Sequence, residues 1–179
     1  MTPLTLPPTT AVLVVDMQND NLHPDGAFAA TGAAEHAQEQ NVVANVRAVL
    51  DAARAADIAV FHNRIVVYPG RGVGGSNAPI FRMLGPESLK LGSWGAAIVD
   101  GLDPREDELV LDRMRMSAFN GTSLDIMLRN LGVTHVVTVV SDATSSVSAE
   151  WQRAALSYAL TNIATVATTA EVAQALSAS

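Results

Sequence analysis

The sequence predicts a three-layer α/β/α domain built on a mostly parallel sheet of five or six strands. Short runs rich in Val, Ile and Leu, typical of strands buried on both faces, alternate with segments whose apolar residues recur at helical spacing. Polar capping and turn residues separate the two kinds of segment. Neither an internal repeat nor a linker interrupts the alternation, so we expect a single domain over residues 1–179.

The first half of the chain supplies two predicted strands with a helix between them. The run AVLVV predicts a strand over Ala11–Val15, which ends directly at Asp16. Helical spacing predicts an amphipathic helix within 40–56, and IAVFH predicts a second strand over 58–62. Residues 68–95 are rich in Gly and Pro, and their GRGVGG run lacks the Lys-Ser/Thr of a phosphate-binding loop. We interpret this segment as a lid or an interface loop.

The second half of the chain continues the alternation of strands and helices and contains a turn at which we predict a functional site. Its predicted elements are, in order, a short helix over 98–102, a third strand starting at 108–111, a helix over 123–131, a central strand over 135–140, a helix over 147–160, a fifth strand over 162–167, and a last helix opened by a capping box of Thr168 and Glu171. Arg113 and Arg115 lie two residues apart and therefore on one face of the third strand. The turn SDATSS presents free backbone N–H groups at the start of the helix over 147–160, where they can stabilise an anion or an oxyanion.

The composition narrows the class of protein. Hydrophobic residues make up 49% of the 179 residues and charged residues 16%, which excludes a disordered chain. The net charge is −7 without any basic cluster, so nucleic acid and anionic membrane surfaces are poor partners. No apolar run approaches the ~20 residues of a membrane span. The first ten residues lack the pattern of a signal peptide, so we expect a cytoplasmic protein.

Several polar side chains follow the predicted strands at the edge where α/β proteins place their chemistry. Asp16 is positioned for a general acid or base, and Arg64 could grip a substrate carboxylate through its planar fork. Gln18, Asp20, His23 and Asp25 lie close together in sequence, but no regular spacing makes them converge, and we predict no metal site. The candidate substrate-binding residues are Gln18, Arg64, Trp94, Arg115, Phe119, Asp142, Ala143, Thr144 and Ser146.

Three segments resemble one known family. LVVDMQND (Leu13–Asp20), DRMRMSAFNGTSLDIMLRNLGV (Asp112–Val133) and VVSDATSSVSAEWQRAALSYAL (Val139–Leu160) are similar to the isochorismatase-like hydrolases, also called the cysteine hydrolase superfamily. GSWGAAIVDGL (Gly92–Leu102) also fits, so the resemblance covers nearly the whole chain in the family's order. It implies the isochorismatase-like fold.

The resemblance also implies where a catalytic triad of Asp, Lys and Cys would stand. The Asp corresponds to Asp16, whereas the Lys position holds Arg113 and the Cys position holds Val147. The chain contains no cysteine, so thiolate attack, disulfides and thiolate metal ligands are all excluded. Arg113 also differs from the implied Lys because arginine stays protonated in proteins. Ser141 replaces the family's usual Gly, a further departure.

Three functions remain open. The first is cysteine-independent hydrolysis of a small molecule, for which the family's vinyl-ether-cleaving members are the model and Asp16 is the implied acid. A fixed arginine beside that carboxylate would oppose proton donation. The second is a non-catalytic binding or assembly protein, and the third is a repurposed biosynthetic enzyme with a non-hydrolytic acid/base step. Ser146 and Ser148 are weak replacements for the nucleophile because neither points where residue 147 does.

We expect no cofactor and a small-molecule substrate or ligand. A mean hydropathy of +0.22 is high for a soluble domain. Members of the resembled family are commonly dimers or tetramers, and a homodimer or homotetramer would cover the excess apolar surface.

Overall fold

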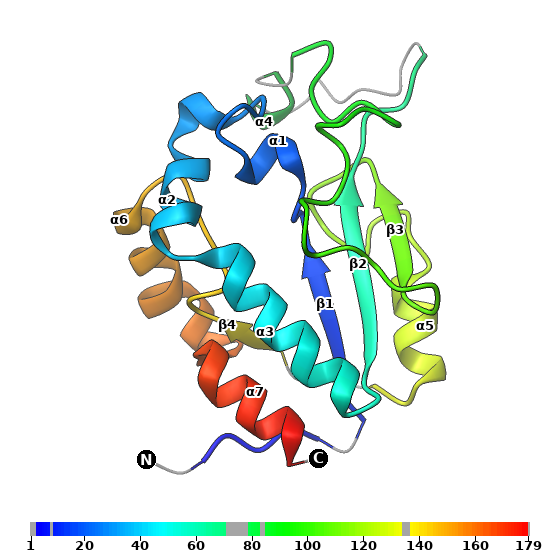
Figure 1. Ribbon diagram of the computed structural model, residues 1–179, viewed down its shortest axis with the longest axis vertical. Helices are drawn as coiled ribbons and strands as arrows, with labels where there is room; N and C mark the ends of the chain where they lie inside the picture. Colours follow the sequence, from blue (N-terminus) through cyan, green and yellow to red (C-terminus); the bar gives the residue numbers. More distant parts are fainter. Residues whose placement is uncertain (1–2, 8, 71–78, 83–84, 134–136, 179) are drawn as a thin grey trace.

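The computed structural model of the chain describes residues 3–7, 9–70, 79–82, 85–133 and 137–178. Its strands and helices alternate along the chain, as the sequence predicts (Figure 1). The strands are β1 (Ala11–Val15), β2 (Ala59–Ile65), β3 (Leu109–Arg113), β4 (Thr138–Val140) and β5 (Thr165–Ala167). The α-helices are α1 (Asn19–Leu22), α2 (Ala33–Glu39), α3 (Val42–Ala55), α4 (Pro79–Arg82), α5 (Leu124–Asn130), α6 (Ala149–Ala154) and α7 (Thr169–Ser177). A 3-10 turn (Ala29–Thr31) precedes α2, and a π-turn (Ala155–Ala159) and a second 3-10 turn (Leu160–Asn162) follow α6.

All strand pairs in the described ladders are parallel, which confirms the α/β class. The strands form a three-stranded sheet in the order β1-β2-β3 and a separate pair, β4-β5, rather than one sheet of five or six strands. Residues of both β1 and β4, Leu13 and Val140 among them, line a cavity of about 140 Å³.

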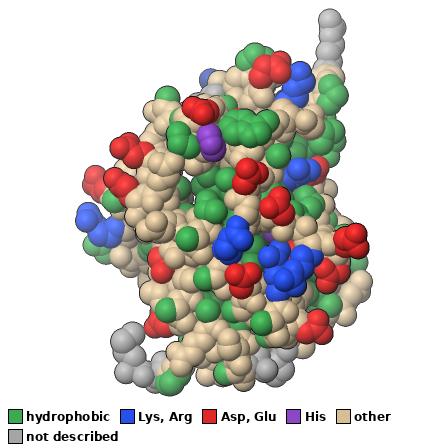
Figure 2. Space-filling model, in the orientation of Figure 1, with side chains coloured by type: hydrophobic (Ala, Val, Ile, Leu, Met, Phe, Trp, Pro, Cys, Tyr) green, Lys and Arg blue, Asp and Glu red, His purple; other side chains and the backbone are tan. Residues whose placement is uncertain are grey.

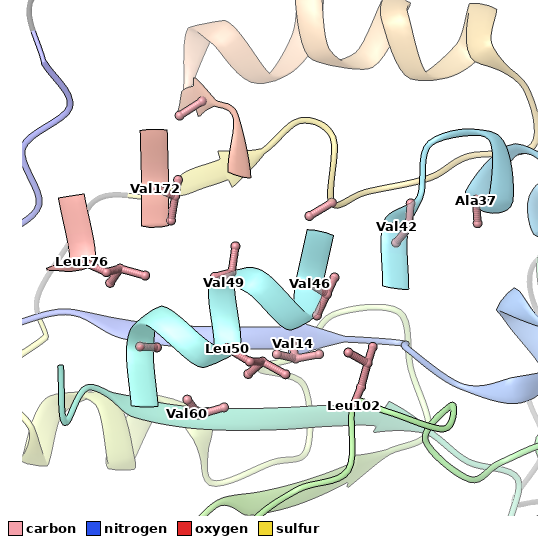
Figure 3. Close-up of a cluster of buried hydrophobic side chains, with 13 residues drawn as sticks. Val14, Ala37, Val42, Val46, Val49, Leu50, Val60, Leu102, Val172 and Leu176 are labelled. Atoms are coloured by element: carbon pink, nitrogen blue, oxygen red, sulfur yellow. The ribbon is translucent and has the colours of Figure 1, made fainter. Parts of the chain in front are cut away.

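The hydrophobic core lies between the three-stranded sheet, α3 and α7. Val46, Val49 and Leu50 on α3 are buried against Val14 and Val60 of the sheet (Figure 3). Burying such aliphatic side chains stabilises the fold by roughly 1.5–3 kcal/mol each. The helical spacing within 40–56 therefore correctly identified the buried face of α3. Helix α7 begins at the predicted capping box, in which Thr168 and Glu171 each accept the other's backbone N–H.

Some local expectations differ from the structure. The second strand extends to Ile65, three residues beyond its predicted end, and the short helix expected over 98–102 is absent. Ile98 instead forms an isolated bridge with Gln18. The central strand was expected to be buried over 135–140, but β4 is short and half-buried, and residues 134–136 lie outside the described part of the chain.

The helix over 147–160 departs most from its prediction. Its regular α-helical part is α6, and the expected apolar face points to solvent, with Trp151 67% and Tyr158 78% exposed. Gln152 is the buried residue of α6, since its amide donates to the carbonyl oxygen of Ser141. Exposed aromatic side chains suit a subunit interface, and the homodimer or homotetramer stays a prediction.

On the face shown in Figure 2, the described Lys and Arg side chains are interspersed with Asp and Glu. Within the described ranges, none of the helices combines the length and apolarity that crossing a membrane requires. A cytoplasmic location stays a prediction.

Candidate functional site

Asp16 lies at the carboxyl end of β1 in a left-handed backbone conformation. Its φ is +59°, which costs an L-residue on the order of 1–2 kcal/mol. Three hydrogen bonds fix this conformation: its N–H donates to the carbonyl oxygen of Asn63 at 2.9 Å, and its own carbonyl oxygen accepts from the Gln18 N–H and the Asn21 amide at 2.8 Å each. The chain therefore turns sharply where β1 ends, and the Asp16 side chain is oriented towards β3.

Arg113 meets that carboxylate at the end of β3. Nη1 donates to Asp16 Oδ1 and Nη2 to Asp16 Oδ2, each at 2.7 Å, a bidentate pair of charge-assisted hydrogen bonds. Nη1 also donates to Asn63 Oδ1 at 2.6 Å, while Nη2 and Nε donate to the carbonyl oxygen of Met116 at 3.0 and 3.3 Å. These five contacts equal the five N–H groups of a guanidinium. Arg113 therefore has no donor left for a substrate.

Exposure separates the roles of the two partners. The Arg113 side chain is 1% exposed, and the Asp16 side chain is 31% exposed. The buried guanidinium holds the carboxylate in one orientation, and the carboxylate presents its remaining lone pairs outwards. Within this pair, Asp16 is the group that a small molecule can reach.

Asn63 is a member of this cluster that the sequence did not single out. It is 1% exposed and binds both partners, Asp16 through its backbone carbonyl and Arg113 through its side-chain oxygen. Its Nδ2 is buried without a hydrogen-bond partner in the described part of the chain. The parallel register pairs Ile65 with Arg113, which places Asn63 on the same sheet face. Only this non-local register brings Asn63 to the site.

Gln18 supports the site and has no free group for a substrate. It is fully buried, its Nε2 donates to the carbonyl oxygens of Ile65 and Ala96 at 2.9 Å each, and its Oε1 accepts the Ile65 N–H at 3.0 Å. Asp20 also has a structural role, because its two carboxylate oxygens accept hydrogen bonds from the backbone N–H groups of Ala27 and Leu89. The polar residues after Asp16 therefore hold loops together. Over the described ranges, no three His, Asp or Glu side chains converge as a metal site would require.

Arg64 also lies away from the cluster. It forms a bidentate pair with Asp112, with Nε–Oδ1 and Nη2–Oδ2 distances of 2.8 and 2.9 Å. Because strand residues alternate between faces, Arg64 and Asp112 lie on the face opposite Asn63 and Arg113. Arg64 is thus paired within the chain, and its role in gripping a substrate carboxylate stays a prediction.

Arg115 differs from its prediction in another way. Strand β3 ends at Arg113, so Arg115 lies on the following bend and not on the strand face. Its guanidinium carbon stands 5.4 Å from the centre of the Phe81 ring, and its Nη1 donates to the Met114 carbonyl at 2.9 Å. This cation–π contact holds the guanidinium in place without neutralising it.

Two predicted aromatic residues are exposed. Trp94 is 53% and Phe119 52% exposed, and Trp94 makes an edge-to-face contact with His23 at 5.0 Å between ring centres. The carbonyl oxygen of Trp94 accepts from the Asn19 amide, which ties the Trp94 loop to α1. Both rings are therefore available to contact a ligand or another protein surface.

The turn after β4 contains the position implied for the nucleophile. Val147 is 39% exposed and offers no nucleophilic atom. Asp142 Oδ1 accepts both the N–H and the hydroxyl of Thr169, at 2.7 and 2.9 Å, so this carboxylate links the turn to α7. Thr144 donates its hydroxyl to the Ser141 carbonyl, and Ala143 is buried in the core. Three of the residues expected to bind substrate here thus make structural contacts.

A buried histidine that the sequence did not indicate holds the same turn. His36 on α2 is 5% exposed, and its Nδ1 lies 3.1 Å from Ser145 Oγ and 3.2 Å from the Ser146 carbonyl oxygen. Its Nε2 lies 3.1 Å from the Gln40 amide. Ser146 therefore contributes its backbone to a structural contact, and α2 is fixed against the turn.

A second charged cluster lies at the opposite, amino end of β2 and β3. Glu108 receives Arg54 Nε and Nη2 at 2.7 and 2.8 Å and lies 2.9 Å from His62 Nε2. The hydrogen bonds from Arg54 lower the pKa of Glu108 from 4.5 to about 2. A cavity of about 510 Å³ adjoins this cluster, lined by Arg54 and Glu108 together with Phe61 and Leu131.

Comparison with known proteins identifies the family. The isochorismatase domain matches residues 10–139. Ureidoacrylate amidohydrolases RutB from Rhizobium rhizogenes and Agrobacterium fabrum are 32% and 34% identical to the chain over 157 and 152 residues, each match covering 76% of the chain. These matches span 61% and 66% of the two relatives, less than two thirds of their length. An isochorismatase family protein from Burkholderia thailandensis superposes with a TM-score of 0.77 at 26% identity, over 98% of this chain and 99% of that one. With an isochorismatase domain over most of its length and this fold, the chain belongs to the isochorismatase family, and the relatives it matches are named as hydrolases.

Proposed function

We propose that the chain is a hydrolase of a small molecule that works without a covalent thiol intermediate, with Asp16 as its general acid/base. The observation that carries this proposal is the pair of Asp16, partly exposed, and Arg113, buried with all five N–H groups engaged. Such a clamp orients a carboxylate for proton transfer. The isochorismatase domain and the hydrolase names of the relatives support the reaction class.

In the proposed reaction Asp16 acts first as the base. Two hydrogen bonds from a permanently charged guanidinium hold the two carboxylate oxygens in one orientation. Asp16 then takes a proton from a water molecule as the water oxygen bonds to the substrate carbonyl carbon. When the carbon–nitrogen bond breaks, the same proton passes to the leaving nitrogen. Asp16 is thereby returned to its starting form, and amide or ureido cleavage agrees with the name of the relatives.

A nucleophilic side chain has little support at this site. Val147 cannot attack a carbonyl, and Ser148 accepts the Trp151 N–H as the cap of α6. Ser145 lies next to His36, but its hydroxyl also contacts the carbonyl oxygens of Ala33 and Ser146 at 3.3 Å. Its contacts are those of a residue that fixes the turn.

The test measures turnover of a substrate panel by wild type and by Asp16→Asn. The panel holds ureidoacrylate, which the relatives' name suggests, together with simple ureido acids, small primary amides and isochorismate. Asp112→Asn is a matched control, because Asp112 is also bound by a bidentate arginine but on the other sheet face. We expect hydrolysis of an amide or ureido compound that falls by about 10²–10⁴-fold in Asp16→Asn and is retained in Asp112→Asn.

Two results would overturn the proposal. One is no turnover of any panel member by the wild type, and the other is equal turnover by wild type and Asp16→Asn. Intact-protein mass spectrometry during turnover is expected to show no covalent adduct. An acyl-enzyme on a serine would contradict the water-based route.

A further inference from the structure

A cavity of about 310 Å³ lies where α6 meets the end of α2 and the turn after β4 (Figure 1). Residues of α6 and of the π-turn that follows it line this cavity together with Gln40, Ser141 and Asp142. None of the described residues that line it forms a hydrogen bond with Asp16 or Arg113. The proposed hydrolase therefore leaves the polar groups of this cavity without a role.

Asp142 supplies a negative charge to the cavity and uses half of its carboxylate within the fold. Its Oδ1 accepts both the N–H and the hydroxyl of Thr169, at 2.7 and 2.9 Å. Over the described ranges, its Oδ2 accepts no hydrogen bond. Because Thr169 fixes the orientation of the carboxylate, Oδ2 is an ordered anionic acceptor that remains available to an N–H group of a ligand.

Two glutamines of the lining each have an amide oxygen without a partner. Gln152 is 5% exposed, its Nε2 donates to the Ser141 carbonyl oxygen, and its Oε1 is buried without a hydrogen bond in the described part of the chain. The Gln40 Nε2 can only donate to His36 Nε2, 3.1 Å away, and the Gln40 amide oxygen has no partner among the described residues. A buried acceptor left unpaired costs free energy, which a donor from a ligand would remove. With Asp142 Oδ2, these two oxygens equal in number the three N–H groups of a primary ammonium.

Arg153 supplies a positive charge to the same cavity. It lies on α6, is exposed, and its side chain forms no ion pair or hydrogen bond with the part of the chain that the structure describes. A guanidinium with its N–H groups unused is suited to receive a carboxylate through two parallel hydrogen bonds. Asp142 and Arg153 are the charged residues among those described in the lining, so an ammonium and a carboxylate would each meet one opposite charge.

We propose that this cavity binds a small zwitterion with a primary ammonium and a carboxylate, the charge pattern of a free amino acid. The ammonium donates to Asp142 Oδ2 and to the amide oxygens of Gln152 and Gln40, and the carboxylate accepts from Arg153. The Leu156 side chain, which also lines the cavity, contacts the apolar part of the ligand. This binding site goes beyond the proposed function and does not depend on it.

Calorimetric titration of four five-carbon compounds tests the proposal without requiring turnover. L-norvaline carries both charges on neighbouring carbons and 5-aminopentanoate carries them at opposite ends, whereas pentylamine has only the ammonium and pentanoate only the carboxylate. We expect at least one of the two zwitterions to bind at least tenfold more tightly than either singly charged compound.

Two substitutions locate the binding in this cavity. Asp142→Asn removes the charge and keeps an acceptor for Thr169, and Arg153→Gln removes the guanidinium from an exposed position. Each is expected to weaken binding of the zwitterion at least tenfold. Glu150→Gln is the matched control, because Glu150 is an exposed acid on the same helix but does not line the cavity, and it is expected to bind the zwitterion as the wild type does.

The outcomes separate this site from the proposed hydrolase. Failure of both zwitterions to bind the wild type, or binding no tighter than that of pentylamine or pentanoate, would overturn the proposal. Unchanged binding in Arg153→Gln would also overturn it, and this exposed position provides the test even if Asp142→Asn does not fold, which thermal unfolding shows. Asp16→Asn is expected to bind the zwitterion as the wild type does, whether or not it loses turnover.

Discussion

Glu108→Gln is expected to remove much of the acid sensitivity of this fold. The Glu108 side chain is 6% exposed and accepts two hydrogen bonds from Arg54 and one from the Arg105 N–H. Its pKa is lowered from 4.5 to about 2, chiefly by the hydrogen bonds from Arg54. The side-chain amide of glutamine does not take up a proton in this pH range. It has one acceptor oxygen and no charge, so it cannot accept both hydrogen bonds from Arg54 as the carboxylate does.

The direction and the size of the change in folding stability with pH follow from the linkage between proton binding and folding. Because the pKa is lower in the folded chain, the unfolded chain takes up the proton first as the pH falls. The stabilisation by Glu108 is therefore present above about pH 5 and is lost progressively as the pH falls through the folded pKa, near 2. The pKa difference corresponds to about 3 kcal/mol at neutral pH, of which about 2 kcal/mol is lost between pH 5 and pH 3.

Urea unfolding followed by circular dichroism at pH 7, 5, 4 and 3 measures the effect. The difference in unfolding free energy between wild type and Glu108→Gln is expected to shrink by about 2 kcal/mol from pH 5 to pH 3. Asp125→Asn is the control, since Asp125 has a lowered pKa but forms an exposed pair with Arg129 on one helix. A difference that stays constant across this pH range, or an equally large change for Asp125→Asn, would refute the reasoning.

Three further substitutions test the site and its support. Arg113→Lys provides three N–H donors in place of five and loses the bidentate contact with Asp16, so urea unfolding is expected to show a loss of about 1–3 kcal/mol; an unchanged midpoint would contradict the clamp. Val147→Cys creates the chain's single thiol. Because the N–H groups of the buried Arg113 are all engaged, the rate of alkylation by iodoacetamide is expected to follow an ordinary thiol pKa of about 8.5. Fast alkylation at pH 6 would contradict this expectation, since it would show an activated thiolate. Gly32→Ala adds a Cβ 2.9 Å from the Val147 carbonyl oxygen at a φ of +85°. The same unfolding measurement is expected to show a free energy of unfolding lower by about 1–2 kcal/mol. An unchanged free energy of unfolding would contradict this close contact.

The sequence by itself determined the alternation of elements and several of their limits. The strand over Ala11–Val15, the buried face of the helix over 42–55 and the capping box at Thr168 all depend on residues close together in the chain. It also determined that Asp16 has no thiol partner, because the chain has no cysteine. Local propensity and residue identity are sufficient for such statements.

The helix after β4 shows what the local sequence could not predict, namely which face of a helix is buried. Its apolar spacing correctly groups Trp151 and Tyr158 on one face, but spacing does not say whether that face meets the core or the solvent. The structure exposes this face and buries Gln152, which finds a hydrogen-bond acceptor at the end of β4. Burial depends on what the rest of the chain places beside a helix.

The tertiary structure alone decided how the charged side chains near the strand ends are partnered. The family resemblance distinguishes Arg113 from Arg64 and Arg115 but gives none of their partners, and strand alternation turns Arg64 to one face and Arg113 to the other. The register of β2 against β3 then brings Asn63 to Arg113 and leaves Arg115 on the bend beyond the strand. Register and face are set by pairing between residues 50 positions apart, as in the hydrogen bond from Arg113 to Asn63, and such pairing leaves no signal in the local sequence.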